Sequence, residues 1–480
     1  MMTLKPSLRF LTATAGASLL LASCAVGPKA PDATLPPSAS GAFIGAASPA
    51  VSANTTARDD WWRLYNDPVL DGLVGEALAN NNELEAAAAN LRRVRAALGE
   101  ARVGRFPSTT TSAGVTTGRP SAATVPGLPA GTEAPESDTY SAGLDVSYEV
   151  DLFGRVESTV RAARADASAA EAALNVVRVT VAAETARAYA DACSGNAQIA
   201  VAERTITLQT DTVGLTQRLL DAGSGNGLDV ARARSALEST RSTLPPLRAQ
   251  RDGALFRLAT LTGRTPAETS EAARACAAPP QLTQPIPVGD GAAMLARRPD
   301  VRQAERNLAA AAARVNVATA DLYPRITLGG SAGATALDAS GLGDNENFRF
   351  SVGPLISWSF PNVFAARARI EQAGASSDAA LATFDQTVLV ALQETETALA
   401  NYANELDRRS ALQSARDQAA NAARLSRLRF DAGADSFLTV LDSERTLAAA
   451  DAQLASSSAL VTTYQIALFK ALAGGWTNEG

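Results

Sequence analysis

Three cysteines carry the clearest chemistry in this chain, because the sequence contains no histidine. The lack of histidine excludes imidazole acid–base catalysis and metal sites with histidine ligands. Acidic residues are scattered along predicted helix faces, without a nucleophile–base set among them. The glycines at 223, 225 and 227 lack the strand–helix context and the lysine of a phosphate-binding loop. The sequence therefore predicts a protein that is not an enzyme and that uses no metal or cofactor.

The first cysteine, Cys24, follows a segment that has the pattern of an export signal. Two basic residues, Lys5 and Arg9, precede an apolar stretch of signal-peptide length. The sequence Leu21-Ala22-Ser23-Cys24 resembles a bacterial lipobox, which predicts removal of residues 1–23 and attachment of lipid to the Cys24 thiol. Two or more acyl chains would anchor the chain stably to a membrane. An ordinary signal sequence with an incidental cysteine is the alternative.

Residues 24–58 are rich in Pro, Ala, Ser and Gly, and we predict that they form a lipid-anchored extended linker. Residue 25 is alanine rather than aspartate, which for such lipoproteins indicates the outer membrane of a Gram-negative cell. No later stretch contains eighteen consecutive apolar residues, so no transmembrane helix is expected. The net charge of −6 argues against a nucleic-acid partner.

The other two cysteines, Cys193 and Cys276, are predicted to form a disulfide, because an oxidising compartment favours pairing of the thiols that remain after lipidation. Cys193 lies 28 residues before Asp221, which is roughly 40 Å along a helix. Gly263, thirteen residues before Cys276, ends a second helix roughly 50 Å from the same turn. Both cysteines are therefore expected at a similar distance from this turn. Two unpaired cysteines are the alternative.

Two predicted α-hairpins contain most of the chain and must position these side chains. Good helix formers with apolar residues at helical spacing fill residues 154–263, which fold back at a Gly-rich turn that begins at Asp221. Residues 363–473 repeat this arrangement with a turn that begins at Asp431. Both turns read Asp-Ala-Gly, and a glycine after a helical run supplies the left-handed residue that ends it. The sequence therefore predicts an internal duplication, with long arms that each extend roughly 100 Å.

The duplication also sets the predicted domain boundaries. The first repeat covers residues 59–290 and ends in an irregular midsection segment, residues 264–290. The second repeat covers residues 291–480. Each repeat begins with a shorter helix that ends at an aromatic–proline pair, and a strand pair and the long hairpin follow. The shorter helix of the first repeat is expected to break near Asn80-Asn81-Asn82.

The predicted strand pairs are residues 108–118 with 139–150 and residues 325–335 with 348–358. Alternation of apolar and polar residues over about ten positions is typical of a transmembrane barrel strand. A half-buried sheet in a soluble domain would show the same alternation. Pro354 cannot donate to a strand ladder, so we expect it to mark a bulge. Four strands cannot close into a barrel and open edges do not persist in lipid, so a membrane sheet requires several chains to share one barrel.

Several motifs together resemble those of the outer-membrane efflux lipoproteins, the NodT-like branch of the TolC-like outer-membrane factors. They are Cys24-Ala-Val-Gly-Pro, Trp61-Trp62, Tyr148-Glu149-Val150-Asp151-Leu152-Phe153-Gly154-Arg155, Arg298-Pro299-Asp300 and Tyr323-Pro324. The resemblance covers essentially the whole mature chain. The combination is specific, although each motif alone is weak.

This resemblance implies a fold that is mainly α with a membrane β-barrel portion. Three copies would contribute four strands each to a twelve-stranded outer-membrane barrel, which a periplasmic α-barrel continues. The homotrimer would dock onto a periplasmic adaptor protein and an inner-membrane pump, usually of the resistance-nodulation-division class. The candidates for adaptor contact at the turns are Gly223, Leu228, Gly433 and Leu438. Asp431 and Asp435 would add negative charge that favours cations at the entrance.

Charged residues beyond the two turns suggest how the tunnel mouth closes. Superposing the turns places Arg232 on Asp442 and Arg234 on Glu444, so the charge is reversed at equivalent positions of the two hairpins. Residues two apart on a helix point to nearly opposite sides, so only one of the two pairs can face a given contact. Arg232 with Asp442 is the favoured latch. The alternative is that these charges are solvated surface groups of little energetic value.

The predicted function is therefore a passive exit duct for drugs or other small molecules, which a pump and an adaptor would supply. A duct for type I protein secretion is the alternative within this class. A structural coiled-coil lipoprotein of the cell envelope is the alternative from a different class. The strand pairs argue against such a strut, which has no use for lipid-compatible hairpins at matching points of each repeat.

Overall fold

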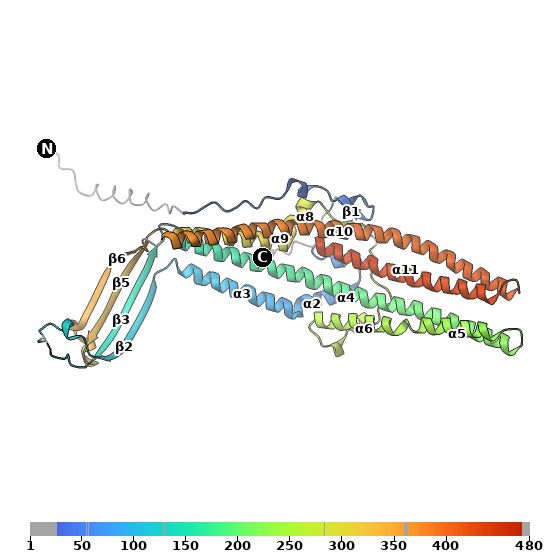
Figure 1. The fold of residues 1–480 in the computed structure, drawn as a ribbon, viewed down its shortest axis with the longest axis horizontal. Helices are drawn as coiled ribbons and strands as arrows, with labels where there is room; N and C mark the ends of the chain where they lie inside the picture. The colour runs from blue at the N-terminus through green and yellow to red at the C-terminus, as the bar shows by residue number, and fades with distance from the viewer. Residues whose placement is uncertain are drawn as a thin grey trace. The chain divides into compact units, whose positions relative to one another are not determined.

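The computed structural model describes residues 26–53, 55, 57–127, 129, 131–282, 284–359 and 363–472. The chain divides into two compact units, and each unit takes residues from both repeats. In Figure 1 the colour runs from blue to yellow along the first repeat and from yellow to red along the second. The first unit comprises Met1–Ala33, Leu91–Ala170 and Ala304–Phe384, and the second comprises Thr34–Asn90, Glu171–Gln303 and Asp385–Gly480. Two long helices, α4 (Arg155–Asp221) and α10 (Val363–Asp431), contribute residues to both units.

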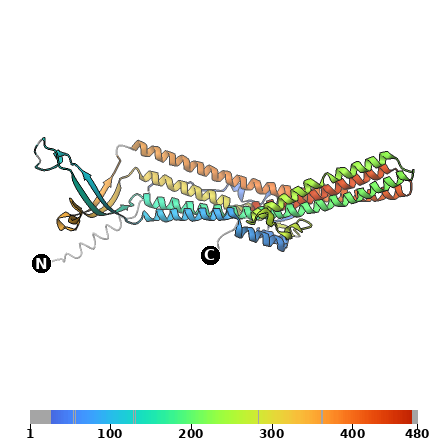
Figure 2. The same ribbon diagram turned by 90° about the horizontal axis from the view of Figure 1, so that it is seen from below.

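A four-stranded antiparallel sheet is the β portion of the first unit (Figure 2). Its strands are β2 (Ser108–Gly118), β3 (Ser137–Val150), β5 (Arg325–Ala336) and β6 (Phe348–Ser357), in the order β2-β3-β5-β6. The two predicted strand pairs are therefore confirmed. They join through β3 and β5, whose pairing runs from Tyr140 opposite Ala336 to Val150 opposite Ile326. Among the described residues, β2 and β6 each pair with one strand only.

Large apolar side chains of β6 are exposed in the single chain. Phe350, Val352 and Ile356 are 76%, 83% and 65% exposed. Aromatic and β-branched residues suit a strand backbone, which explains why this segment is extended. A run of such side chains in water is unfavourable, so this surface is suited to contact with lipid or another chain.

The bulge expected at Pro354 is wrong. The pairing of β5 with β6 continues from Arg325 opposite Ser357 to Ala334 opposite Phe348, and Pro354 lies opposite Leu328 without an extra residue. Because β6 is an edge strand within the chain, a residue that lacks an N–H is tolerated on its unpaired side.

Helices α3 (Asn82–Val103) and α9 (Pro299–Ala320) precede the strand pairs of the two repeats, and α4 and α10 follow them. In the first unit, Leu98 of α3 is buried against Val160 and Ala167 of α4. The rings of Phe153 and Tyr323 stack with centroids 4.6 Å apart. This contact joins the segment that follows β3 to the segment that precedes β5. Three short helices, η4 (Ala122–Thr124), η6 (Ser340–Gly343) and η7 (Asn345–Asn347), lie in the loops between strands.

A side-chain cap starts α4 directly after β3. The Asp151 carboxylate accepts hydrogen bonds from the backbone N–H groups of Val156 and Glu157 at 3.0 and 2.8 Å. Gly154 has a φ of 73°, a left-handed conformation that glycine adopts without strain. The carboxylate also lies favourably at the positive end of the helix dipole. The Asp-Leu-Phe-Gly sequence thus turns the chain sharply from strand to helix.

The second unit contains the remaining helices and one short parallel strand pair. Its elements are η1 (Pro37–Ser40), η2 (Ile44–Ala47), β1 (Val51–Ser52), η3 (Trp61–Tyr65), α2 (Pro68–Asn80), α5 (Gly227–Arg241), α6 (Leu244–Leu261), η5 (Pro266–Glu268), α7 (Glu271–Arg274), β4 (Ile286–Pro287), α8 (Gly291–Arg297) and α11 (Phe437–Leu472). Strand β1 pairs with β4. Across the described part of the chain, no helix has both the length and the hydropathy that a membrane span requires.

The helix break predicted near Asn81 is confirmed. Asn81 lies between α2 and α3, where its side-chain oxygen accepts from the backbone N–H groups of Glu83 and Leu84. The return arm of the first hairpin, residues 228–263, is also divided, into α5 and α6. Pro245 and Pro246 occupy the first turn of α6, where a missing N–H is harmless, but they would break a helix interior.

Candidate functional site

The two hairpin turns have matching backbone conformations. Gly223 and Gly433 both have a φ of 72°, so the predicted left-handed conformation is confirmed at each turn. Leu228 and Leu438, the second residues of the return helices α5 and α11, are 57% and 50% exposed. The duplicated sequence therefore places one accessible leucine next to each turn, where a protein partner could contact it.

The predicted latch residues do not meet within the chain. Arg232 lies 3.8 Å from Asp229, three residues earlier on α5. Asp442 lies on the exposed side of α11, and among the described residues no ion pair joins it to Arg232. The latch was expected between alternating hairpins of an assembly, so it stays a prediction.

The two acidic residues at the second turn have arginine neighbours. Asp431 lies 3.9 Å from Arg427, and Asp435 accepts hydrogen bonds from Arg429 at 2.7 and 3.2 Å. The hydrogen bond from Arg429 lowers the pKa of Asp435 below its usual value. These contacts offset part of the negative charge expected at this end of the hairpin.

A half-buried polar cluster near the turns escaped the sequence analysis. The Thr212 hydroxyl of α4 donates to Glu444 of α11 at 3.0 Å, and Arg427 of α10 donates to the same carboxylate at 3.3 Å. Burial raises the pKa of Glu444, against the opposing effects of Thr212 and Arg427. Arg234, the residue that turn superposition matched with Glu444, donates to Gln217 at 3.0 Å instead. Only the packing of three helices brings this cluster together.

Cys193 of α4 and Cys276 beyond α7 form a disulfide in the structure, with their Cα atoms 5.1 Å apart. Cys193 is fully buried. The Asn196 side chain donates to the carbonyls of Arg274 and Cys276 at 2.9 and 2.7 Å. Together these contacts fasten the segment after α6 to α4. The predicted lipid-attachment residue, Cys24, lies outside the described residues.

Thiol titration of the denatured, unreduced protein is expected to find neither Cys193 nor Cys276 free. The bond joins residues 83 positions apart, so its reduction is expected to lower the free energy of unfolding. A loss of about 2–4 kcal/mol is typical for such a bond. Two titratable thiols, or thermal unfolding that reductant leaves unchanged, would contradict this prediction. A double Cys193→Ala, Cys276→Ala variant controls for effects of the reductant elsewhere.

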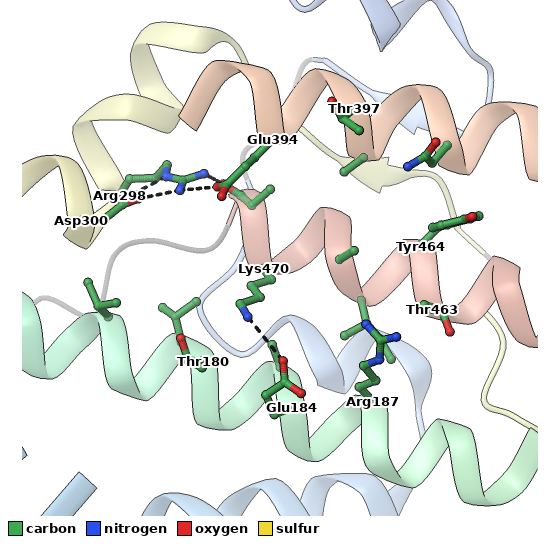
Figure 3. A pocket seen from close by; sticks show the side chains of 18 of the residues that line it. Thr180, Glu184, Arg187, Arg298, Asp300, Glu394, Thr397, Thr463, Tyr464 and Lys470 are labelled. Atoms are coloured by element: carbon green, nitrogen blue, oxygen red, sulfur yellow. Dashed lines mark hydrogen bonds and ion pairs between the residues drawn. The ribbon is translucent and has the colours of Figure 1, made fainter. Parts of the chain in front are cut away.

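A groove of about 800 Å³ lies among α4, α10, α11 and the start of α9 (Figure 3). Its charged lining consists of Glu184, Arg187, Arg298, Asp300, Glu394 and Lys470. Arg298 is the most buried of these, with 8% of its side chain exposed. Its guanidinium donates to Asp300 at 2.6 Å, to Glu394 at 2.7 Å and to the Ala471 carbonyl at 3.0 Å.

A second ion pair crosses the groove between α4 and α11. The Lys470 ammonium lies 3.4 Å from the Glu184 carboxylate, and Figure 3 shows the two side chains pointing toward each other. Arg298 and Asp300 belong to one of the motifs of the family resemblance, whereas Glu394, Glu184 and Lys470 were not predicted from the sequence. No local signal could have found them, because their partners lie on other helices.

The acidic side chains that line the groove are each paired with an arginine or a lysine. Over the described residues, no group of His, Cys, Asp and Glu side chains is arranged to hold a metal ion.

Known proteins are similar to this chain over most of its length. The pyoverdine export outer membrane protein OpmQ of Pseudomonas aeruginosa is 32% identical over 429 residues, which are 87% of this chain and 88% of that protein. The toluene efflux pump outer membrane protein TtgC of Pseudomonas putida is 32% identical over 442 residues, which are 90% of this chain and 88% of that protein. The structure of the outer-membrane channel OprN has a TM-score of 0.87 at 36% identity, covering 94% of this chain and 100% of that chain.

A family model described as outer membrane efflux protein matches residues 73–264 and again residues 292–474. The matched segments fall one in each repeat. Together with the paired strands, the duplicated hairpins and the likeness to OprN, this match shows that the chain belongs to the outer membrane efflux protein family.

Proposed function

We propose that this chain is the outer-membrane exit duct of a tripartite efflux system, which passively conducts drugs or other small molecules to the exterior. The observation that carries the proposal is the four-stranded sheet: among the described residues its outer strands β2 and β6 each pair on one side, and β6 exposes the apolar side chains of Phe350, Val352 and Ile356. Open strand edges are not stable in lipid. Three copies would therefore close one twelve-stranded barrel, and closed rotational symmetry is the usual arrangement of such assemblies.

The proposed partners are those that the family resemblance implies. A duct without its own energy source needs an inner-membrane pump, here of the resistance-nodulation-division class, and a periplasmic adaptor. Leu228 and Leu438 are the surfaces we assign to the adaptor, because they are exposed at equivalent places beside the two turns. A lipid on Cys24 would anchor the chain to the outer membrane. Small molecules are favoured over secreted proteins, since the similar proteins are named for pyoverdine export and toluene efflux.

Two measurements test the duct. Native mass measurement in mild detergent is expected to give a trimer, and the purified trimer is expected to form ion channels in planar bilayers. A stable monomer that retains its strand signal would contradict the shared barrel. Loss of the gene is expected to increase susceptibility to small-molecule drugs while protein secretion continues; the reverse pattern would favour the secretion duct.

The latch is tested by the conductance of the closed channel. Asp442→Ala and Arg232→Ala are each expected to raise single-channel conductance, because each removes one side of an attraction that holds the mouth closed. The double variant should open little further, since both substitutions remove the same contact. Arg234→Ala is the matched control, because Arg234 bonds to Gln217 within its own hairpin. Additive opening, or none from either substitution, would show that another contact closes the mouth.

A further inference from the structure

The three helices around the groove have two different faces. In the second unit, one face is covered by the segment that precedes α2. The Tyr189 hydroxyl of α4 donates to Asp67 at 2.8 Å. The Glu396 carboxylate of α10 accepts the backbone N–H groups of Ile44 and Gly45 at 2.7 and 3.0 Å. On α11, Gln465 accepts from the Tyr65 hydroxyl at 3.3 Å. These partners all come from residues 44–67.

The groove lies on the other face of the same helices. Its lining includes Arg187, Glu394 and Thr463, each two residues before one of the covered residues. Two residues along an α-helix turn the side chain by about 200°, so the groove faces away from the covering segment. The side chains of Glu184, Lys470, Arg187 and Glu394 are 36%, 43%, 46% and 53% exposed, so this face is in contact with solvent.

The charges of the groove balance. Glu184, Asp300 and Glu394 supply three negative charges, and Arg187, Arg298 and Lys470 supply three positive charges, so their sum is zero. A water-filled pore needs a polar wall, and rings of charge in that wall determine which ions pass. When three copies surround one axis, each charge becomes a ring, and a balanced lining favours neither sign.

We propose that this face lines the duct, and that the Glu184–Lys470 pair keeps this section of its wall electrically neutral. The inference rests on the proposed exit duct and identifies its ion-selectivity determinants. The covered face would then lie outside, where the segment leading to the lipid anchor can pass without blocking the duct. A neutral, polar section admits small solutes of either charge. A section with one uncompensated ring of charge would instead favour solutes of the opposite charge.

Ion selectivity tests the charge balance. Lys470→Gln leaves Glu184 uncompensated in each copy, so the ratio of potassium to chloride permeability should rise. Glu184→Gln should lower the same ratio. In water, a unit charge about 10 Å from an ion's path changes the local ion concentration about twofold, so each shift should be at least about twofold at low salt. The reversal potential of single channels under a potassium chloride gradient gives the ratio, and Lys470→Arg should restore the wild-type value.

Arg264→Gln provides the matched control, because Arg264 does not line the groove. Arg264 forms an ion pair with Glu76 of α2, and its side chain is 45% exposed. This substitution removes the same charge as Lys470→Gln, but we expect no change in the permeability ratio. Equal shifts from both variants would mean a non-local effect and would overturn the assignment.

Chemical labelling tests which face contacts the pore. Thr397 lines the groove and is exposed, so a membrane-impermeant charged thiosulfonate should react with Thr397→Cys and reduce single-channel conductance. Ala267→Cys lies in η5, in the segment that the disulfide fastens to α4, and its labelling should leave conductance unchanged. If labelling of Thr397→Cys leaves the conductance unchanged and Lys470→Gln leaves the permeability ratio unchanged, this inference is overturned, but the proposed duct is not. Wild-type protein that forms no channels would instead overturn the duct itself.

Discussion

Trp61→Ala is expected to lower the free energy of unfolding by about 3–5 kcal/mol, the range for removing a large aromatic side chain from a packed core. Trp61 is 1% exposed and stacks on Phe469, with ring centroids 4.9 Å apart and planes 11° from parallel. Tyr65 packs edge-on against both rings, at 6.5 and 6.4 Å. Since these residues connect the segment before α2 to the end of α11, the substitution should loosen the packing of that segment against α11.

The measurement is thermal unfolding of the detergent-extracted protein, followed by helix circular dichroism. Trp61→Phe should lower the free energy of unfolding by less, because it keeps a ring against Phe469 and leaves a smaller cavity. Ile44→Ala is the matched surface control, since the Ile44 side chain is 89% exposed and its replacement should change stability by less than about 0.5 kcal/mol. If Trp61→Ala unfolds at the wild-type temperature, the aromatic cluster does not stabilise this unit.

Arg298→Ala is expected to destabilise the protein by about 1.5–3 kcal/mol, the usual contribution of a hydrogen bond to a charged group, because the guanidinium is buried while its two carboxylate partners are partly exposed. The guanidinium connects three places in the chain, Asp300 at the start of α9, Glu394 of α10 and the Ala471 carbonyl near the end of α11. Its removal leaves the two carboxylates close together and the carbonyl without this donor. Part of the cost is therefore repulsion between acids, in addition to lost hydrogen bonds.

Two variants separate charge from geometry at this position. Arg298→Lys keeps the charge but not the planar fork that reaches several acceptors at once, so an intermediate loss is expected. Arg306→Ala on α9 is the control, because the Arg306 side chain is 46% exposed and lies 3.6 Å from Glu305. Such exposed pairs contribute about 0–1 kcal/mol. Equal transition temperatures for Arg298→Ala and Arg306→Ala would refute a stabilising role for the buried arginine.

The local elements of this fold were predictable because their signals lie within a few residues of one another. Period-two alternation predicted the second and fourth strands and, more weakly, the Thr- and Gly-rich first and third strands, and the structure has all four at nearly the same residues. The repeated Asp-Ala-Gly sequences predicted two helix ends, where Gly223 and Gly433 share a φ of 72°. The bulge expected at Pro354 was wrong, since the effect of a missing N–H depends on whether the strand has a neighbour on that side.

Contacts between distant residues were decided by tertiary structure. Helical periodicity identifies the buried side of α4, α10 and α11, but it does not say which residue of the next helix lies opposite. Sliding one helix by a single turn, about 5.4 Å, would exchange every partner while preserving every local pattern. Glu444 therefore meets Thr212 and Arg427 rather than the residue that the repeat suggested.

The sequence by itself determined the duplication, the strand pairs, the helix ends and, through its motifs, the family. Each of these depends on spacing along the chain and on the conformational preferences of individual residues. The tertiary structure alone decided that Glu184 meets Lys470, that Arg298 reaches Glu394, and that one face of the helices is covered while the other is open. The physical reason is that side-chain contacts depend on how helices pack in three dimensions, and residues hundreds of positions apart carry no local record of that packing.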